Sequence, residues 1–205
     1  DNCIQCNQCS MVCPHAVIRP FLAEEADLEN APESFVTIDA VGREVKGLKY
    51  RIQISPLDCT GCGNCAQVCP SKEKSLVMEP LADHAIEQDA NWNFALSLPN
   101  RATEIPTNTI KNAQFKQPLF EFSGACAGCG ETAYIKLATQ LFGDRMMIAN
   151  ATGCSSIYGG SAPTCPYSVN EHGHGPSWAN SLFEDNAEFG LGINMAQEAR
   201  RTNLG

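Results

Sequence analysis

The stretch Cys3-Ile4-Gln5-Cys6-Asn7-Gln8-Cys9-Ser10-Met11-Val12-Cys13-Pro14 has a second copy of its cysteine spacing in Cys59-Thr60-Gly61-Cys62-Gly63-Asn64-Cys65-Ala66-Gln67-Val68-Cys69-Pro70. This spacing is typical of a pair of [4Fe–4S] clusters in which the fourth cysteine of each run binds the other cluster. The pattern therefore predicts two ligand sets. One set is Cys3, Cys6, Cys9 and Cys69, and the other is Cys59, Cys62, Cys65 and Cys13.

Two other uses of these eight cysteines fit the pattern less well. A structural zinc site needs only two CxxC pairs, not two matched quartets. A disulfide framework is typical of small secreted domains, and the sequence shows no secretory signal. The chain has 12 cysteines in all. We therefore predict metal ligands in a reducing compartment, and a cytoplasmic location.

The bulk composition excludes several classes of partner. The chain has 205 residues, which is room for one or two domains, and 43% of them are hydrophobic. No apolar run approaches the roughly 18 residues of a membrane helix. The formal charge of -9 argues against binding to nucleic acid, which requires clustered Lys and Arg. We expect a soluble chain whose acidic redox partners dock on a local basic patch or on another subunit.

Hydrophobic patterns divide the chain into three parts. Residues 1–80 contain both cysteine runs, and alternating residues in 35–38 and 48–54 predict an inserted hairpin between them. Residues 81–118 are rich in Pro, Asn and Thr and predict a linker with one packed segment, in which residues 92–98 alternate. A helix at Leu81–Gln88 is expected to close the first module.

Residues 119–205 predict part of an α/β domain. Apolar residues recur with helical spacing between Tyr134 and Phe142, and Gly143 is expected to end that helix. The apolar run 146–149 predicts a buried parallel strand, followed by a small-residue loop at 150–156 of the kind that holds ligands at the carboxyl end of a strand. The chain ends in a predicted helix, 195–205. A cysteine ligand at position 3 and the lack of a closing strand lead us to expect a segment of a larger protein.

A third set of cysteines leaves three interpretations open. Cys126 and Cys129 form a CxxC flanked by glycines, and Cys154 follows the predicted strand. The pair could be a thioredoxin-like redox motif, or the three cysteines with Cys165 could bind zinc. They could also bind a third [4Fe–4S] cluster and extend the chain of electron carriers.

Three segments closely resemble pyruvate:ferredoxin oxidoreductase: residues 122–131, 150–156 and 175–190. The order of the motifs, with the ferredoxin-like module first, is also that of this family. The resemblance implies a 2-oxoacid oxidoreductase with thiamine diphosphate, Mg2+ and three [4Fe–4S] clusters. The fold class it implies is an α+β two-cluster ferredoxin-like domain with an inserted hairpin, followed by part of an α/β thiamine-diphosphate-binding domain.

Individual residues take roles from this resemblance. Cys126, Cys129 and Cys154 match ligands of the cluster nearest the thiamine diphosphate, whose fourth ligand lies farther downstream. Glu131 matches a contact to the aminopyrimidine, although a carboxylate at a helix N-terminus would explain it equally. Phe183 matches an aromatic residue beside the thiazolium, with core packing as the alternative.

Other residues and segments remain outside this assignment. We expect Cys165 to be structural, and His172 and His174 to lie in a loop near the substrate or dimer surface. The Gly-Asp-Gly segment, the glutamate that activates thiamine and the coenzyme A site of the family do not occur in the sequence. We therefore assign no catalytic residue and expect the segment alone to be inactive.

The resemblance implies oxidative decarboxylation of pyruvate with coenzyme A, giving acetyl-CoA and CO2. Electrons would pass through three clusters to ferredoxin or flavodoxin, in a homodimer that works in anaerobic metabolism. Within the enzyme class, 2-oxoglutarate or indolepyruvate are alternative substrates. The alternative from another class is an electron-transfer adaptor, an eight-iron ferredoxin fused to a zinc-stabilised α/β domain.

Overall fold

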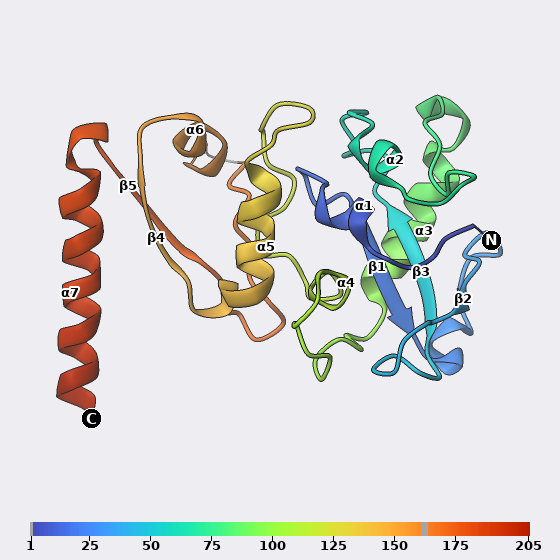
Figure 1. Cartoon of the computed structure of the whole chain (residues 1–205), viewed down its shortest axis with the longest axis horizontal. Coiled ribbons are helices and arrows are strands. Elements are labelled where there is room, and N and C mark those ends of the chain that lie inside the picture. Colours follow the sequence, from blue (N-terminus) through green and yellow to red (C-terminus); the bar gives the residue numbers. More distant parts are fainter. Residues whose placement is uncertain (1, 161–163) are drawn as a thin grey trace.

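A three-stranded antiparallel sheet organises the first half of the chain, in a computed structural model that describes residues 2–160 and 164–205. Strand β1 (Ile18–Ala23) pairs with β3 (Lys49–Ile54) along its whole length, and the short β2 (Ile38–Asp39) lies on the other edge of β3 (Figure 1). The predicted hairpin is present as β2 and β3. Its first strand is shorter than the sequence pattern predicted, and most of the pairing of β3 is with β1.

The two cysteine runs repeat in backbone conformation as well as in sequence. Each leads into a short helix, α1 (Gln8–Met11) or α2 (Asn64–Val68), and the two helices contact each other. Gln5 and Asn7 have left-handed backbones, with φ of 55° and 59°, and the equivalent Gly61 and Gly63 have φ of 68° and 77°. This conformation is uncommon for a residue with a side chain. Its occurrence at matching places shows that both loops turn in the same way.

Residues 81–118 pack against this module. A 3-10 helix (Leu81–Asp83) leads into α3 (Ala85–Ser97), so the predicted helix is present and longer than expected. The predicted packed segment at residues 92–98 is present, but residues 92–97 are helical, and Trp92 and Ala95 are buried on one face. The Trp92 ring meets the Phe21 ring of β1 edge-on, with centroids 6.0 Å apart.

The remainder of this stretch contributes to the main core. It contains one short helix, α4 (Ile110–Ala113). The core cluster consists of residues from the sheet, its connections and this stretch: Leu22, Val45, Tyr50, Ala102, Ile105 and Phe115. The segment expected to be a linker is therefore part of the packing of the ferredoxin-like module.

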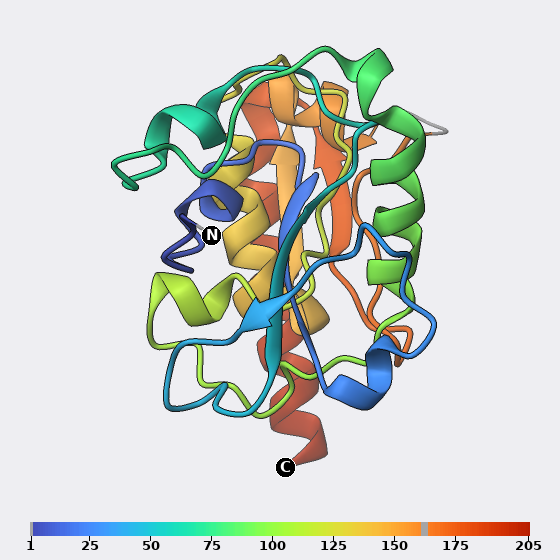
Figure 2. The ribbon, with the colours of Figure 1, turned by 90° about the vertical axis from the view of Figure 1, so that its right-hand side faces the viewer.

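The second half has an α/β arrangement. It contains α5 (Thr132–Phe142), β4 (Met147–Ala151), α6 (Cys154–Gly160), β5 (Ser177–Ser181) and α7 (Asn186–Leu204), as well as two 3-10 helices, Gly143–Arg145 and Phe183–Asp185. Strands β4 and β5 pair in parallel, with α5 on one side and α7 on the other (Figure 1). The predicted helix and parallel strand are present, but β4 is not buried, since Met147 is 47% exposed and the other four residues are only partly buried. The final helix is also present, but it begins at Asn186, earlier than predicted. The view in Figure 2 shows the two sheets one behind the other, with α3 along the side of the molecule.

Helix α5 buries its polar face. Thr132, Lys136, Thr139 and Gln140 are buried, whereas the side chains of Tyr134 and Phe142 are 71% and 51% exposed. Two of these side chains bond to main-chain groups of residues 116–119. Thr139 Oγ1 accepts from the Leu119 N–H at 3.1 Å, and Gln140 Nε2 donates to the Lys116 carbonyl at 2.8 Å. We call these four residues the polar stripe.

Helix α7 buries none of its residues fully, and it meets the sheet near Gly190, where a Cβ would lie 3.7 Å from the Ala149 Cβ. None of the helices in the described part of the chain has the length and apolar character needed to cross a membrane.

Candidate iron–sulfur centres

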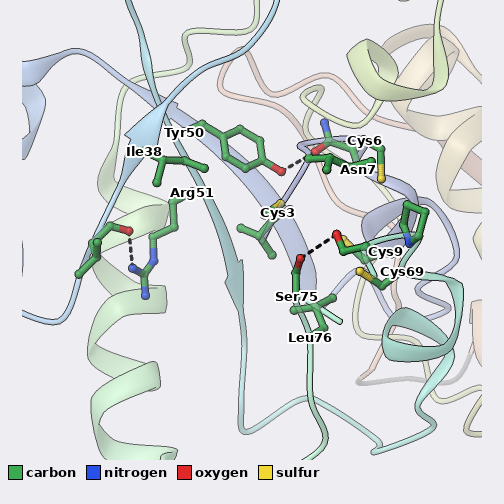
Figure 3. A pocket seen from close by; sticks show the side chains of 15 residues that line it. Cys3, Cys6, Asn7, Cys9, Ile38, Tyr50, Arg51, Cys69, Ser75 and Leu76 are labelled. Atoms are coloured by element: carbon green, nitrogen blue, oxygen red, sulfur yellow. Dashed lines mark hydrogen bonds between the residues drawn. The ribbon is translucent and has the colours of Figure 1, made fainter. Parts of the chain in front are cut away.

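The first candidate centre is a cavity of 320 Å³ lined by Cys3, Cys6, Cys9 and Cys69 (Figure 3). Three of these cysteines come from the first run and the fourth from the second, which is the grouping that the spacing predicts. Apolar and aromatic side chains complete the wall: Ile38, Tyr50, Ile52 and Leu76.

Tyr50 is the largest buried side chain in this wall and was not identified as a site residue from the sequence. It is 2% exposed, and its hydroxyl donates to Asn7 Oδ1 at 2.7 Å (Figure 3). Burial, and then the charges of Cys3 and Cys9, raise the pKa of Tyr50, so the hydroxyl stays a donor. Asn7 in turn donates to the Lys111 carbonyl at 2.8 Å. Tyr50 therefore fixes the left-handed loop next to Cys6.

The second candidate centre is a cavity of 360 Å³ lined by Cys13, Cys59, Cys62 and Cys65. Here too, one cysteine comes from the opposite run. Leu76 lines both cavities, so its side chain forms part of the wall between the two centres. Each predicted quartet is thus gathered around a cavity of its own.

The surroundings of the sulfurs suit thiolates bound to a cationic group. The Gln5 N–H donates to Cys3 Sγ at 3.4 Å. Burial disfavours the ionised Cys69, but hydrogen bonds from the backbone N–H groups of Ser75 and Ser71 outweigh it and lower the pKa of this thiol to about 7. Burial, against a bond from the Ser10 N–H, raises the pKa of Cys9 to about 12. A buried thiol of this kind ionises when a metal group compensates its charge.

The quartets are also more open than a mononuclear site. Among the residues described, no three Cys, His, Asp or Glu side chains converge closely enough to hold a single metal ion. A zinc ion requires its sulfurs at about 2.3 Å. A [4Fe–4S] cubane binds its four thiolates around a wider group, in line with the cysteine spacing of the two runs.

The loop of the third cysteine pair shares one left-handed position with the two runs, but Gly130, after Cys129, does not share the second. Gly128 precedes Cys129 and has φ of 73°, which matches Gln5 before Cys6 and Gly61 before Cys62. Burial disfavours the Cys129 thiolate, but hydrogen bonds from the backbone N–H groups of Glu131 and Thr132, at the start of α5, outweigh it and lower the pKa of the thiol.

This loop lies against the second centre. A Cβ at Gly128 would be 3.6 Å from the Cys62 Cβ. Cys126 and Cys154 are both exposed. Cys154 begins α6, at the same end of the α/β half as the start of α5 (Figure 1). The Cys165 thiol donates to the Gly159 carbonyl at 3.4 Å, and the described residues do not gather it with the other three cysteines into one mononuclear site.

The two residues matched to thiamine contacts are both accessible. Glu131 is exposed at the N-terminus of α5, and Phe183 is 75% exposed at the start of its 3-10 helix. Burial, and then the Glu131 carboxylate, raise the pKa of Tyr158. Glu131 therefore faces the α6 side of the domain. His172 and His174 lie in an exposed turn whose backbone N–H groups both donate to Asn170 Oδ1.

The sequence interpretation also missed Lys136. This lysine is 2% exposed, and its ammonium donates to the Ser10 carbonyl beside the first centre. Its one visible signal is a lysine between the apolar residues Ile135 and Leu137. The apolar periodicity between Tyr134 and Phe142 predicted that the other face of the helix is buried.

Comparisons with known proteins agree with the first half of this picture. The model of a 4Fe-4S dicluster domain matches residues 2–72, so the first part of the chain is a ferredoxin-like dicluster domain of mixed α and β structure. The whole chain is 67% identical to part of a pyruvate:ferredoxin oxidoreductase of Moorella thermoacetica and 59% identical to part of a pyruvate-flavodoxin oxidoreductase of Enterobacter agglomerans. It is 54% identical, over 99% of its length, to part of a mitochondrial pyruvate dehydrogenase [NADP(+)] of Euglena gracilis. The chain spans 17% of the first two relatives and 11% of the third.

Proposed function

Because the chain is homologous over its whole length to a segment of pyruvate:ferredoxin and pyruvate-flavodoxin oxidoreductases, we propose that it is the electron-conducting segment of such an enzyme. The parent protein oxidatively decarboxylates pyruvate with coenzyme A to acetyl-CoA and CO2. Pyruvate is the substrate that the names of all three relatives share. The segment passes the electrons through three [4Fe–4S] clusters to ferredoxin or flavodoxin, and by itself it does not turn over.

The observation that carries this proposal is the shared geometry of three cysteine loops. In each loop, the residue directly before the second cysteine of the CxxC has a left-handed backbone. These residues are Gln5, Gly61 and Gly128. The contact between Gly128 and Cys62 supports a path from the third centre to the second. The wall that the two ferredoxin centres share at Leu76 supports a path from the second to the first. The order of electron transfer is then third, second, first, and an external carrier.

In this proposal the residues of the chain hold the centres and stabilise their charge. The eight ferredoxin cysteines bind two clusters in the quartets given above, and Cys126, Cys129 and Cys154 bind the third with a ligand from elsewhere in the parent protein. Backbone N–H groups directed at sulfur favour the anionic state and so influence the reduction potential. Cys165 is outside the ligand set.

Thiamine diphosphate with Mg2+ supplies the carbanion chemistry when bound. The accessible Glu131 and Phe183 fit such a group, with Glu131 toward its aminopyrimidine and Phe183 beside its thiazolium. We further propose the domain limits 1–80, 81–118 and 119–205, with the last part belonging to the thiamine-diphosphate-binding domain of a cytoplasmic homodimer.

The test is anaerobic purification of the parent protein, followed by iron analysis and electron paramagnetic resonance. We expect about twelve irons per chain, from three four-iron clusters, and reduction of the clusters on addition of pyruvate and coenzyme A. Cys126→Ser should remove one cluster signal, whereas the control Cys165→Ser should keep all three. About eight irons with one zinc, and no response to pyruvate, would instead establish the adaptor.

A further inference from the structure

Lys136 is a buried cation with no carboxylate partner in the part of the chain that the structure describes. Its side chain extends from α5 toward α1, where the ammonium donates to the Ser10 carbonyl and lies 3.4 Å from the Met11 carbonyl. The nearby Arg19, by contrast, is paired with Glu121. Burial of an unpaired charge costs several kcal/mol unless something nearby compensates it.

The compensating charge is available at the two ferredoxin centres. Ser10 follows Cys9 of the first centre, and Met11 precedes Cys13 of the second by two residues. The ammonium therefore contacts the short connection between ligands of different clusters. Burial lowers the pKa of Lys136 to about 8, the charges of Cys13 and Cys9 act to raise it, and the charge of Arg19 acts to lower it. The side chain therefore lies between ligands of both centres and interacts with their charges.

The charge of a [4Fe–4S] cluster gives this position a consequence. A cubane bound by four thiolates is an anion, and reduction by one electron makes it more negative. A fixed cation nearby stabilises the reduced state more than the oxidised state, and the effect is large where water is excluded. Net charge and exposure are among the factors that set the potentials of such clusters.

We propose that Lys136 is a positioning residue for electron transfer, a buried counter-charge that raises the reduction potentials of both ferredoxin-domain clusters. This inference rests on the proposed function, because it requires clusters in the two cavities. It goes further because it assigns to α5, in the α/β half, a direct effect on the reduction potentials of the clusters in the ferredoxin-like half. It also explains why a lysine lies on the buried polar stripe.

The experiment is a potentiometric titration of the anaerobically purified parent protein, monitored by electron paramagnetic resonance. Lys136→Met removes the charge and keeps an unbranched apolar side chain. We expect the equilibrium constant for reduction of each ferredoxin-domain cluster to fall about tenfold, which is a shift of about 59 mV to lower potential for one electron. Lys136→Arg should leave both potentials close to those of the wild type.

The matched control is Lys116→Met. The Lys116 ammonium also bonds to main-chain carbonyls, those of Ala102 at 2.5 Å and Thr103 at 2.9 Å, and burial also lowers its pKa. Its two partners lie in residues 102–103, outside residues 9–13, which connect the two centres. Its loss should leave the potentials unchanged.

Each result is decisive. Unchanged potentials in Lys136→Met at full iron content would overturn the proposal. If Lys136→Met loses iron, retention of clusters with wild-type potentials in Lys136→Arg supports the counter-charge, and loss of iron in both variants assigns Lys136 to packing alone. The titration uses a chemical reductant. A failure of the proposed enzymatic function would therefore appear separately, in the iron content and in the response to pyruvate.

Discussion

Removal of the Tyr50 hydroxyl tests whether one buried hydrogen bond holds the first centre closed. In Tyr50→Phe the ring remains in the wall of the cavity, but Asn7 Oδ1 loses the donor that lies 2.7 Å away. Tyr50 and Asn7 are 2% and 1% exposed, so water does not readily replace the lost partner. An acceptor left unsatisfied in this way costs about 1–3 kcal/mol.

That cost falls on the loop next to Cys6, and it therefore favours local opening of the first centre. At about 1.4 kcal/mol for each factor of ten, we expect the opening equilibrium to rise roughly 5- to 150-fold. The assay is the rate at which a chelator removes iron from the anaerobic parent protein, followed by the loss of visible absorbance. One cluster should be lost faster than in the wild type.

The control is Tyr134→Phe, which removes the same hydroxyl from a side chain that is 71% exposed on α5. Its rate of iron release should equal that of the wild type. Equal rates for Tyr50→Phe and Tyr134→Phe would refute the argument that the Tyr50–Asn7 bond closes the first centre.

Two further predictions concern a loop and an ion pair. Gly128→Ala should destabilise the third loop by about 1–2 kcal/mol, because it forces a side chain into a left-handed backbone. The signal of the third cluster should therefore decay faster in this variant during chelation. The control Gly130→Ala, which has open space around its Cβ, should match the wild type. Hydrogen bonds from Arg101 lower the pKa of Asp27, so this pair contributes stability above the unfolded pKa of about 3.9 and loses it as the pH falls through the folded value. The urea midpoint of Asp27→Asn should therefore lie below that of the wild type at neutral pH, and a gap that persisted well below pH 4 would contradict this account.

The parts of the fold that the sequence predicted correctly are those with a strong local signal. The spacing of the cysteines predicted which four line each cavity, and their role as cluster ligands stays a prediction. The helix at residues 132–142 and the strand at 147–151 follow from apolar periodicity and a short apolar run. The helix and the strand are predicted from one segment each, whereas the grouping of the cysteines depends on the matched spacing of two runs.

The parts that the sequence did not predict depend on contacts between distant segments. Residues 92–98 alternate in sequence, but Trp92 packs on Phe21 of β1, and that tertiary contact favours a helix. Tyr50 has the pattern of any inward strand residue, and only the fold shows that it faces Asn7. Lys136 became visible as a site residue only when α5 was seen against α1, because nothing in its own segment indicates a buried anionic neighbour.

At the junction between the two halves, the polar stripe of α5 and the segments that face it should tolerate substitutions to different degrees. Every hydrogen bond described above for the stripe ends on a main-chain group, at Ser10, Lys116 or Leu119. Main-chain groups are present whatever the residue, so substitutions in the facing segments leave these bonds intact as long as the backbone keeps its path. Substitutions in the stripe remove them directly. The junction therefore depends on the side chains of α5 more than on the side chains of the segments that face it.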